Sequence, residues 1–235
     1  MSFARRFSNF IFGSSCLGCG FYAEKLDPWL CPKCREELLS LGKDPFFPQE
    51  DVVCLYAMNA LTRRLIHALK YQHMPGLASY LVKQSAACRG GGVYQWFCSF
   101  KKPFLLIPVP LHSSRLRERG YNQTDKIAYA LANQIQGKPF HGVARRSFSE
   151  SQTRLSLRER QCNVAGAFQI KKSFPKEKAT CIIVDDVYTT GATTGACTYA
   201  ILQEKEIDIK VCTLLFEKPV SAALDFVADS DIEWD

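Results

Sequence analysis

Short apolar runs alternate with amphipathic stretches along most of this 235-residue chain. The run at residues 181–184 is apolar on both faces, as in a buried parallel strand, and a helical pattern follows at residues 195–202. Other short runs predict strands at residues 51–57, 104–107, 142–145, 166–170 and 209–216. Amphipathic stretches predict helices at residues 61–71, at 77–87 and from Asn122 or Thr124 to Gln136. This alternation predicts an α/β fold with a mostly parallel sheet flanked by helices.

Four cysteines near the start of the chain form two Cys-x-x-Cys pairs. Eleven residues separate Cys16-Leu-Gly-Cys19 from Cys31-Pro-Lys-Cys34, a spacing that lets four thiolates close a tetrahedron around one ion. Gly20 follows the first pair and permits the tight turn that such a knuckle needs. The pattern predicts a structural Zn²⁺ held by Cys16, Cys19, Cys31 and Cys34, with a redox pair or unliganded thiols as the alternative.

The cysteine array sets apart a small N-terminal module. We predict a zinc-binding module with an N-terminal arm at residues 1–48 and the main domain at residues 49–235. The arm, residues 1–15, is basic and aromatic and permits a short helix. Residues 35–50 are expected to complete the module and, with Pro45 and Pro48, to form a linker to the main domain.

A phosphate-binding turn is predicted after the strand at residues 181–184. Ligands of open α/β sheets bind at the carboxyl ends of the strands, where backbone N–H groups and the start of the next helix favour an anion. Glycine allows close backbone approach, threonine hydroxyls add hydrogen bonds, and no acidic side chain interrupts the turn. The predicted phosphate ligands are Thr189, Thr190, Gly191, Ala192 and Thr193.

Two adjacent carboxylates, Asp185 and Asp186, precede this turn. They cannot both point into one core, so at least one is expected to accept hydrogen bonds from vicinal ribose hydroxyls or from a hydrated metal ion. The alternative is a polar strand end followed by an ordinary helix cap, but the ordered combination favours a sugar-phosphate site. The chain lacks a P-loop sequence and a Gly-x-Gly-x-x-Gly turn, which argues against a P-loop nucleotidase and a dinucleotide dehydrogenase.

Basic residues gather in two segments. Arg115, Arg117 and Arg119 lie in a polar loop after the strand at residues 104–107, where guanidinium groups can bind a pyrophosphate. A second arginine-rich segment covers residues 145–168. A solvated or salt-bridged surface is the alternative for both.

Among other polar side chains, Lys70 is a weaker ligand candidate, because a lysine on an amphipathic helix is more often solvated. The four histidines show no pairing that would identify a general base.

The composition is that of a globular protein, with 47% hydrophobic and 23% charged residues. Because no apolar run is long enough to span a bilayer and the first residues lack a secretory signal, we expect a cytoplasmic protein without membrane insertion.

Several of the eleven cysteines lie singly in apolar runs, and Cys54, Cys181, Cys197 and Cys212 are expected to be reduced core residues. The net charge of +7, despite an acidic end at residues 219–235, suits a polyanionic ligand or partner.

The acidic pair and the turn resemble the signature of the type I phosphoribosyltransferases. The chain as a whole resembles the ComF family in the segments that follow. They are the cysteine array at residues 16–34, Ala68-Leu-Lys-Tyr71, Ile107-Pro-Val-Pro110, Arg117-Glu-Arg-Gly-Tyr-Asn-Gln123, Gln152-x-x-Leu155, Arg160-x-x-Asn163-Val-Ala-Gly-Ala-Phe168 and the Asp-Asp turn.

This resemblance implies a type I phosphoribosyltransferase-like fold with an N-terminal zinc ribbon and an association with natural competence, where single-stranded DNA is handled in the cytoplasm. The ligand that it implies is phosphoribosyl pyrophosphate (PRPP) with Mg²⁺. Asp185 and Asp186 would hold the ribose, residues 189–193 the 5′-phosphate, and Arg115, Arg117 or Arg119 the leaving pyrophosphate.

Three functions agree with these patterns. The first is a PRPP-binding protein that acts in competence through single-stranded DNA. The second is an active phosphoribosyltransferase in nucleotide salvage, and the third is a non-catalytic docking protein for a competence helicase. The residues leave open whether the protein turns over a substrate and which acceptor it would use.

Overall fold

The structure is a computed structural model that describes residues 14–23, 26–86, 92–145, 167–171, 174, 179–203 and 207–218. The N-terminal arm up to residue 13, most of the second arginine-rich segment and the acidic end of the chain lie outside the described residues.

The cysteine module consists of a small hairpin and one helix. Strands β1 (Ser14–Ser15) and β2 (Tyr22–Ala23) pair antiparallel, and Gly20 between them has a φ of +79°, the left-handed conformation expected after the first cysteine pair. Helix α2 (Pro32–Leu41) begins directly after Cys31, with proline in its first turn.

The linker predicted at residues 35–50 is wrong. Helix α2 continues to Leu41, and β3 (Phe46–Gln49) pairs antiparallel with the first strand of the main sheet. Pro48 fits there because β3 is an edge strand with one side free of ladder hydrogen bonds. The division between residues 48 and 49 stays a prediction.

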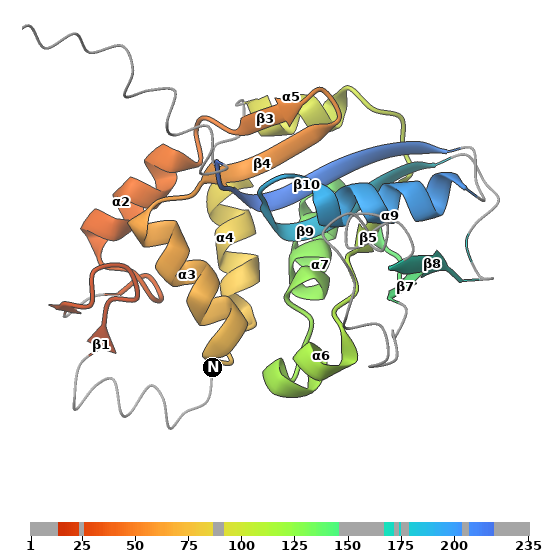
Figure 1. Cartoon of the computed structure of the whole chain (residues 1–235). Helices are drawn as coiled ribbons and strands as arrows, with labels where there is room; N and C mark the ends of the chain where they lie inside the picture. Colours follow the sequence, from red (N-terminus) through yellow and green to blue (C-terminus); the bar gives the residue numbers. More distant parts are fainter. Residues whose placement is uncertain are drawn as a thin grey trace, which may run out of the picture.

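Six strands form the main sheet (Figure 1). Besides β3 they are β4 (Val52–Ala57), β5 (Phe104–Pro108), β6 (Lys138–Pro139), β9 (Thr180–Tyr188) and β10 (Asp208–Phe216). Their order is β3-β4-β10-β9-β5-β6, and every neighbouring pair except β3 and β4 is parallel. The predicted α/β class with a mostly parallel sheet is therefore confirmed.

Helices cover both faces of this sheet. Ile182 and Val184 of β9 pack into one apolar cluster with α3 (Ala60–Tyr71), α4 (Gly76–Ala86) and α7 (Gln123–Ile135). Cys181 and Ile183 pack into a second cluster with α9 (Ala192–Leu202) and with the separate pair β7 (Val143–Arg145) and β8 (Phe168–Ile170). Alternate residues of β9 thus serve opposite cores, which explains why the run reads as apolar on both faces.

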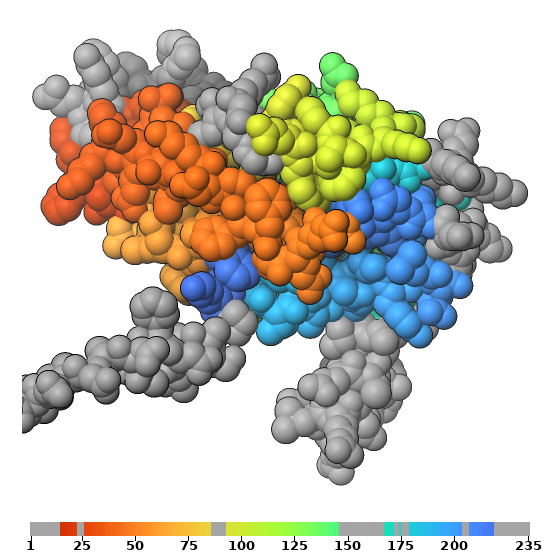
Figure 2. Space-filling model, turned by 90° about the horizontal axis from the view of Figure 1, so that it is seen from above, coloured from red at the N-terminus to blue at the C-terminus, as the bar shows by residue number. Residues whose placement is uncertain are grey.

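Two short helices complete the described part of the chain. Helix α5 (Gly92–Cys98) lies beside the β3–β4 hairpin (Figure 2). The Trp96 indole N–H donates to the carbonyl of Glu50, between β3 and β4, at 3.2 Å. Helix α6 (Ser113–Arg119) occupies the segment predicted as a basic loop, so that loop prediction is wrong. Gly120 ends α6 with a φ of +74°.

The connections around β5 and β9 run in opposite directions. From β5 the chain passes through α7 to β6, whereas from β9 it passes through α9 to β10 on the other side. Ligands of open α/β sheets bind at such a switch point, at the carboxyl ends of the strands. The acidic pair of β9 lies toward this end of the sheet.

The single cysteines of the apolar runs are reduced and buried, as predicted for Cys54, Cys181, Cys197 and Cys212. Burial raises the pKa of Cys54 to about 11 and that of Cys181 to about 12, so both are protonated near neutral pH. Among the helices that the structure describes, none has the length and apolar character needed to cross a bilayer.

Candidate functional site

The two carboxylates lie inside β9, not beyond its end, because the strand continues to Tyr188. Successive side chains of a strand point to opposite faces. Asp186 accordingly contacts side chains of α3 and α7, and Asp185 lies on the face covered by α9 and β7. Both residues are buried. The prediction that they do not share one core is confirmed.

One oxygen of Asp186 holds two donors. The Lys70 ammonium nitrogen lies 3.0 Å from Oδ2, and the Gln123 side-chain amide donates to the same oxygen at 2.6 Å. The Lys70 side chain is 21% exposed. The solvated position that the helix pattern favours for Lys70 is therefore wrong, and this residue neutralises a buried carboxylate.

Asp185 has a different environment. Burial, followed by the neighbouring charge of Asp186, raises the pKa of Asp185 to about 7. The backbone N–H of Asp186, which donates to Oδ1 at 2.8 Å, and the charges of Lys70 and Arg145 act in the opposite direction. Near neutral pH this carboxyl is divided between its protonated and charged forms.

The turn after β9 leads into α9, and the N–H of Ala192 in this turn donates to the Thr190 hydroxyl at 3.4 Å. Gly191 is the N-cap of α9 with a φ of +75°, and no side chain of the cap residue accepts from the first turn. A Cβ at this position would lie 2.8 Å from the Tyr188 ring, so glycine is required by both conformation and space. Thr189, Thr190, Ala192 and Thr193 are exposed. An uncapped helix start with accessible hydroxyls has the donors that a phosphate group needs.

The three arginines of α6 occupy different environments. Arg115 is exposed and lies 3.6 Å from Glu118, and Arg117 is also exposed. Arg119 is buried, donates to the Tyr71 hydroxyl at 3.2 Å and lies 5.0 Å from the centre of that ring. Tyr71 follows Lys70 in the sequence at the end of α3, so Arg119 contacts the neighbour of the residue that binds Asp186. No contact between these arginines and the carboxylates occurs in the described residues.

The four cysteines of the module come together as the spacing predicts. Their sulfur atoms all lie within 4.8 Å of one another, and those of Cys19 and Cys31 are 3.9 Å apart. A tetrahedral Zn²⁺ site with bonds of about 2.3 Å places its sulfurs about 3.8 Å apart, so the cluster can hold a metal ion. Burial opposes ionisation of Cys16, but hydrogen bonds from backbone N–H groups, including those of Gly18 and Cys31, lower its pKa to about 7.

Helix α3 connects this cluster with the carboxylates. Its Arg64 donates to the carbonyl of Gly18, inside the first cysteine pair, and Lys70 binds Asp186 further along the same helix. Cys16 and Cys34 also share an apolar cluster with Leu65 and Leu69 of α3. The module and the main sheet are thus packed together through this helix.

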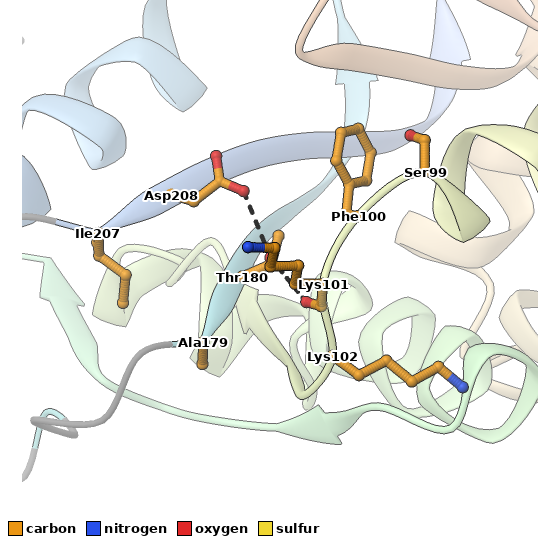
Figure 3. A pocket seen from close by; sticks show the side chains of 8 residues that line it. All are labelled: Ser99, Phe100, Lys101, Lys102, Ala179, Thr180, Ile207 and Asp208. Atoms are coloured by element: carbon orange, nitrogen blue, oxygen red, sulfur yellow. Dashed lines mark hydrogen bonds between the residues drawn. The ribbon is translucent and has the colours of Figure 1, made fainter.

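A cavity of about 620 Å³ lies at the opposite, amino end of the sheet (Figure 3). Thr180 and Asp208, the first residues of β9 and β10, contribute to its wall. Their polar groups are already paired, since Thr180 donates to the Lys101 carbonyl and Asp208 lies 3.1 Å from the Lys210 ammonium. The carboxylate site is therefore the better candidate.

Comparison with known proteins agrees with the sequence resemblance. No family model matches the chain. Competence protein F of Haemophilus influenzae is 35% identical over 97 residues, which cover 40% of this chain and 42% of that protein. DNA utilization protein YhgH of Escherichia coli is 28% identical over 206 residues, covering 82% and 86%. Competence protein ComFC of Bacillus subtilis is 32% identical over 115 residues, covering 48% and 45%.

These homologues confirm the resemblance to the ComF family, although the matches to competence protein F and ComFC span less than half of either protein. Similar solved structures include adenine phosphoribosyltransferase of Saccharomyces cerevisiae, with a TM-score of 0.37 and 17% identity over 80% of this chain and 90% of that one. A hypoxanthine phosphoribosyltransferase of Staphylococcus aureus has a TM-score of 0.34 and 18% identity over 60% and 63%. TM-scores this low do not establish a shared fold. The description of the fold therefore depends only on the strand order and register given above.

Sequence reasoning missed the partners of the acidic pair. In the sequence Gln123 stands out only as part of a segment that carries the family resemblance, and the helix pattern makes Lys70 a weaker ligand candidate. The available signal for Gln123 was its place at the start of a helix that follows a central strand, because such a residue lies at the ligand-binding edge.

Proposed function

We propose that this protein binds phosphoribosyl pyrophosphate and acts in the handling of single-stranded DNA in the cytoplasm, in competence or DNA utilisation. One observation supports the ligand proposal. Strand β9 carries Asp186, which is paired with the Lys70 ammonium, and the same strand then leads into the start of α9, where the N-cap residue provides no side-chain cap. The names of the homologues supply the DNA process.

In this proposal the ligand spans the end of β9. Asp186, on the face of β9 that carries Lys70 and Gln123, accepts hydrogen bonds from the ribose hydroxyls, and residues 189–193 donate to the 5′-phosphate. The pyrophosphate carries a Mg²⁺ ion, which offsets part of its charge. Arg119 of α6, whose Nε has no partner among the described residues, binds the pyrophosphate oxygens that remain.

We propose zinc as the metal of the cysteine cluster. Thiolates at this separation match tetrahedral Zn²⁺, and four protein ligands leave no open position for a substrate. The ion then stabilises the module, and through α3 it supports the carboxylate site.

Single-stranded DNA is the proposed macromolecular partner. Arg115 and Arg117 are exposed on α6, and Tyr71 nearby is 44% exposed. Exposed guanidinium groups bind backbone phosphates, and aromatic faces stack bases without strong sequence preference.

Calorimetric titration of PRPP with Mg²⁺ tests the ligand proposal. The wild type is expected to bind saturably and Asp185→Asn/Asp186→Asn to lose binding. Asp208→Asn, at the opposite end of the sheet, is the matched control and should bind like the wild type. Absence of binding to the wild type would refute the ligand assignment.

A salt-dependent DNA titration tests the partner. An Arg115→Gln/Arg117→Gln variant is expected to bind fluorescent oligothymidylate more weakly and to reduce the slope of log K against log salt by about 1.4, since each lost phosphate contact on a single strand contributes about 0.7. An unchanged slope would remove α6 from the DNA interface, and no binding by the wild type would favour a protein-docking role.

A further inference from the structure

The side chain of Gln123 is buried, and only one end of its amide is paired. It is 3% exposed, and its Nε2 donates to Asp186. Its carbonyl oxygen, Oε1, is also buried and has no partner among the residues that the structure describes. Buried acceptors are nearly always satisfied, so this oxygen requires a partner that the described part of the chain does not provide.

The neighbours of Gln123 decide which end of its side-chain amide faces Asp186. An ionised carboxylate only accepts hydrogen bonds, and Asp186 forms an ion pair with the Lys70 ammonium at 3.0 Å. The nitrogen of Gln123 must therefore face Asp186, and the oxygen is the end left over. Since the two heteroatoms of one amide are about 2.2 Å apart, Oε1 lies within reach of a ligand that also touches Asp186.

The backbone around Gln123 is firmly anchored. The preceding Asn122 caps α7 by accepting from the N–H of Thr124 at 3.2 Å, and its amide donates to the carbonyl of Val109 at 3.1 Å. The Thr124 hydroxyl donates to the same carbonyl at 2.7 Å. These bonds fix the start of α7 to the chain just after β5. Gln123 is thus held on rigid elements, as a group that selects a ligand must be.

We propose that Gln123 is a specificity-determining residue whose Oε1 accepts a hydrogen bond from a ribose hydroxyl of the phosphoribosyl ligand. This inference rests on the proposed function. A sugar that lacks the hydroxyl leaves a buried acceptor unpaired, and sites built in this way reject such analogues. The site therefore selects ribose over the deoxy sugar that lacks this hydroxyl.

Calorimetric titration of three sugar phosphates tests the proposal. Ribose 5-phosphate, 2-deoxyribose 5-phosphate and 3-deoxyribose 5-phosphate are titrated into the wild type, into Gln123→Met and into Gln134→Met, a control on the same helix. The wild type and the control are expected to prefer ribose 5-phosphate over at least one deoxy sugar by about tenfold. Gln123→Met, similar in size but without the acceptor, should lose that preference while binding the disfavoured deoxy sugar about as well as the wild type.

The other outcomes are separable. If Gln123→Met weakens all three sugars equally, the residue has only a structural role and the inference is wrong. If the variant keeps the wild-type preference, the hydroxyl contact is refuted although PRPP still binds. If the wild type binds neither PRPP nor any of the sugar phosphates, the proposed function itself fails, and the inference fails with it.

Discussion

Replacing Asp185 by asparagine is expected to stabilise the folded protein at alkaline pH, although it removes a carboxylate of the proposed site. Burial, and then the charge of Asp186, raise the pKa of Asp185 from 3.8 to about 7. At about 1.4 kcal/mol per pKa unit, ionising this group in the folded state costs about 4 kcal/mol relative to the unfolded chain. Asparagine avoids that cost because it is uncharged, and its side-chain oxygen can still accept the N–H of Asp186.

The effect depends on pH in a defined direction. Between about pH 4 and 7 the folded state keeps a proton on Asp185 that the unfolded chain has lost, so wild-type stability falls as the pH rises through this window. Above about pH 7 Asp185 is ionised in both the folded and the unfolded state, so the stability of the wild type falls no further for this reason. The stability of Asp185→Asn relative to the wild type should therefore increase by about 2 to 3 kcal/mol between pH 5 and 8 and then level off.

Urea unfolding at a series of pH values measures this difference. Wild type and Asp185→Asn are compared in identical buffers and metal content, so contributions from other titrating groups cancel. Asp208→Asn, which alters an exposed carboxylate, is the control and should gain no stability as the pH rises. The reasoning is refuted if Asp185→Asn is no more stable than the wild type at pH 8, or if the difference is the same at pH 5.

Three further predictions address the other parts of the site. Lys70→Met is expected to weaken PRPP binding by at least about tenfold in calorimetry, because Asp186 loses its counter-charge, and Lys70→Arg should restore most of it. Gly191→Ala should lower the free energy of unfolding by about 1 to 2 kcal/mol in urea, because φ is +75°. Gly195→Ala, with open space around it, is the control and should not destabilise. Cys34→Ser, or addition of a chelator, should lower the unfolding temperature by several degrees in calorimetry. Cys98→Ser, which changes an exposed cysteine outside the cluster, is the control and should leave that temperature unchanged. Equal unfolding temperatures for the two variants would contradict a structural metal.

The central strands could be predicted from the sequence because each is apolar and serves two cores. The basic segment before α7 was harder. Its polar and basic residues after a strand predict a loop. The His112 ring accepts from the N–H of Ser114 and Gly120 supplies a left-handed residue at the end, so one short helix forms instead. Caps of this kind are weak signals when the helix has no apolar stripe.

The acidic pair and the turn were found from local order, since strand, carboxylates, turn and helix follow one another in the chain. The partners of Asp186 could not be found in that way. Gln123 lies 63 residues before it, and Lys70 comes from a different helix. Their meeting depends on how α3 and α7 pack over one face of the sheet, which no local pattern encodes.

Helix α3 contacts both the cysteine cluster and the carboxylate site. Arg64 and Lys70 are six residues apart, about 9 Å along the helix axis, so a displacement of α3 at one end alters the other. Under the proposed function, metal binding and ligand binding are therefore expected to be thermodynamically linked. If loss of the ion weakens the ligand by some factor, the ligand must tighten the ion by the same factor. Oxidation of the thiolates would then lower ligand affinity without any chemical change at Asp185 or Asp186.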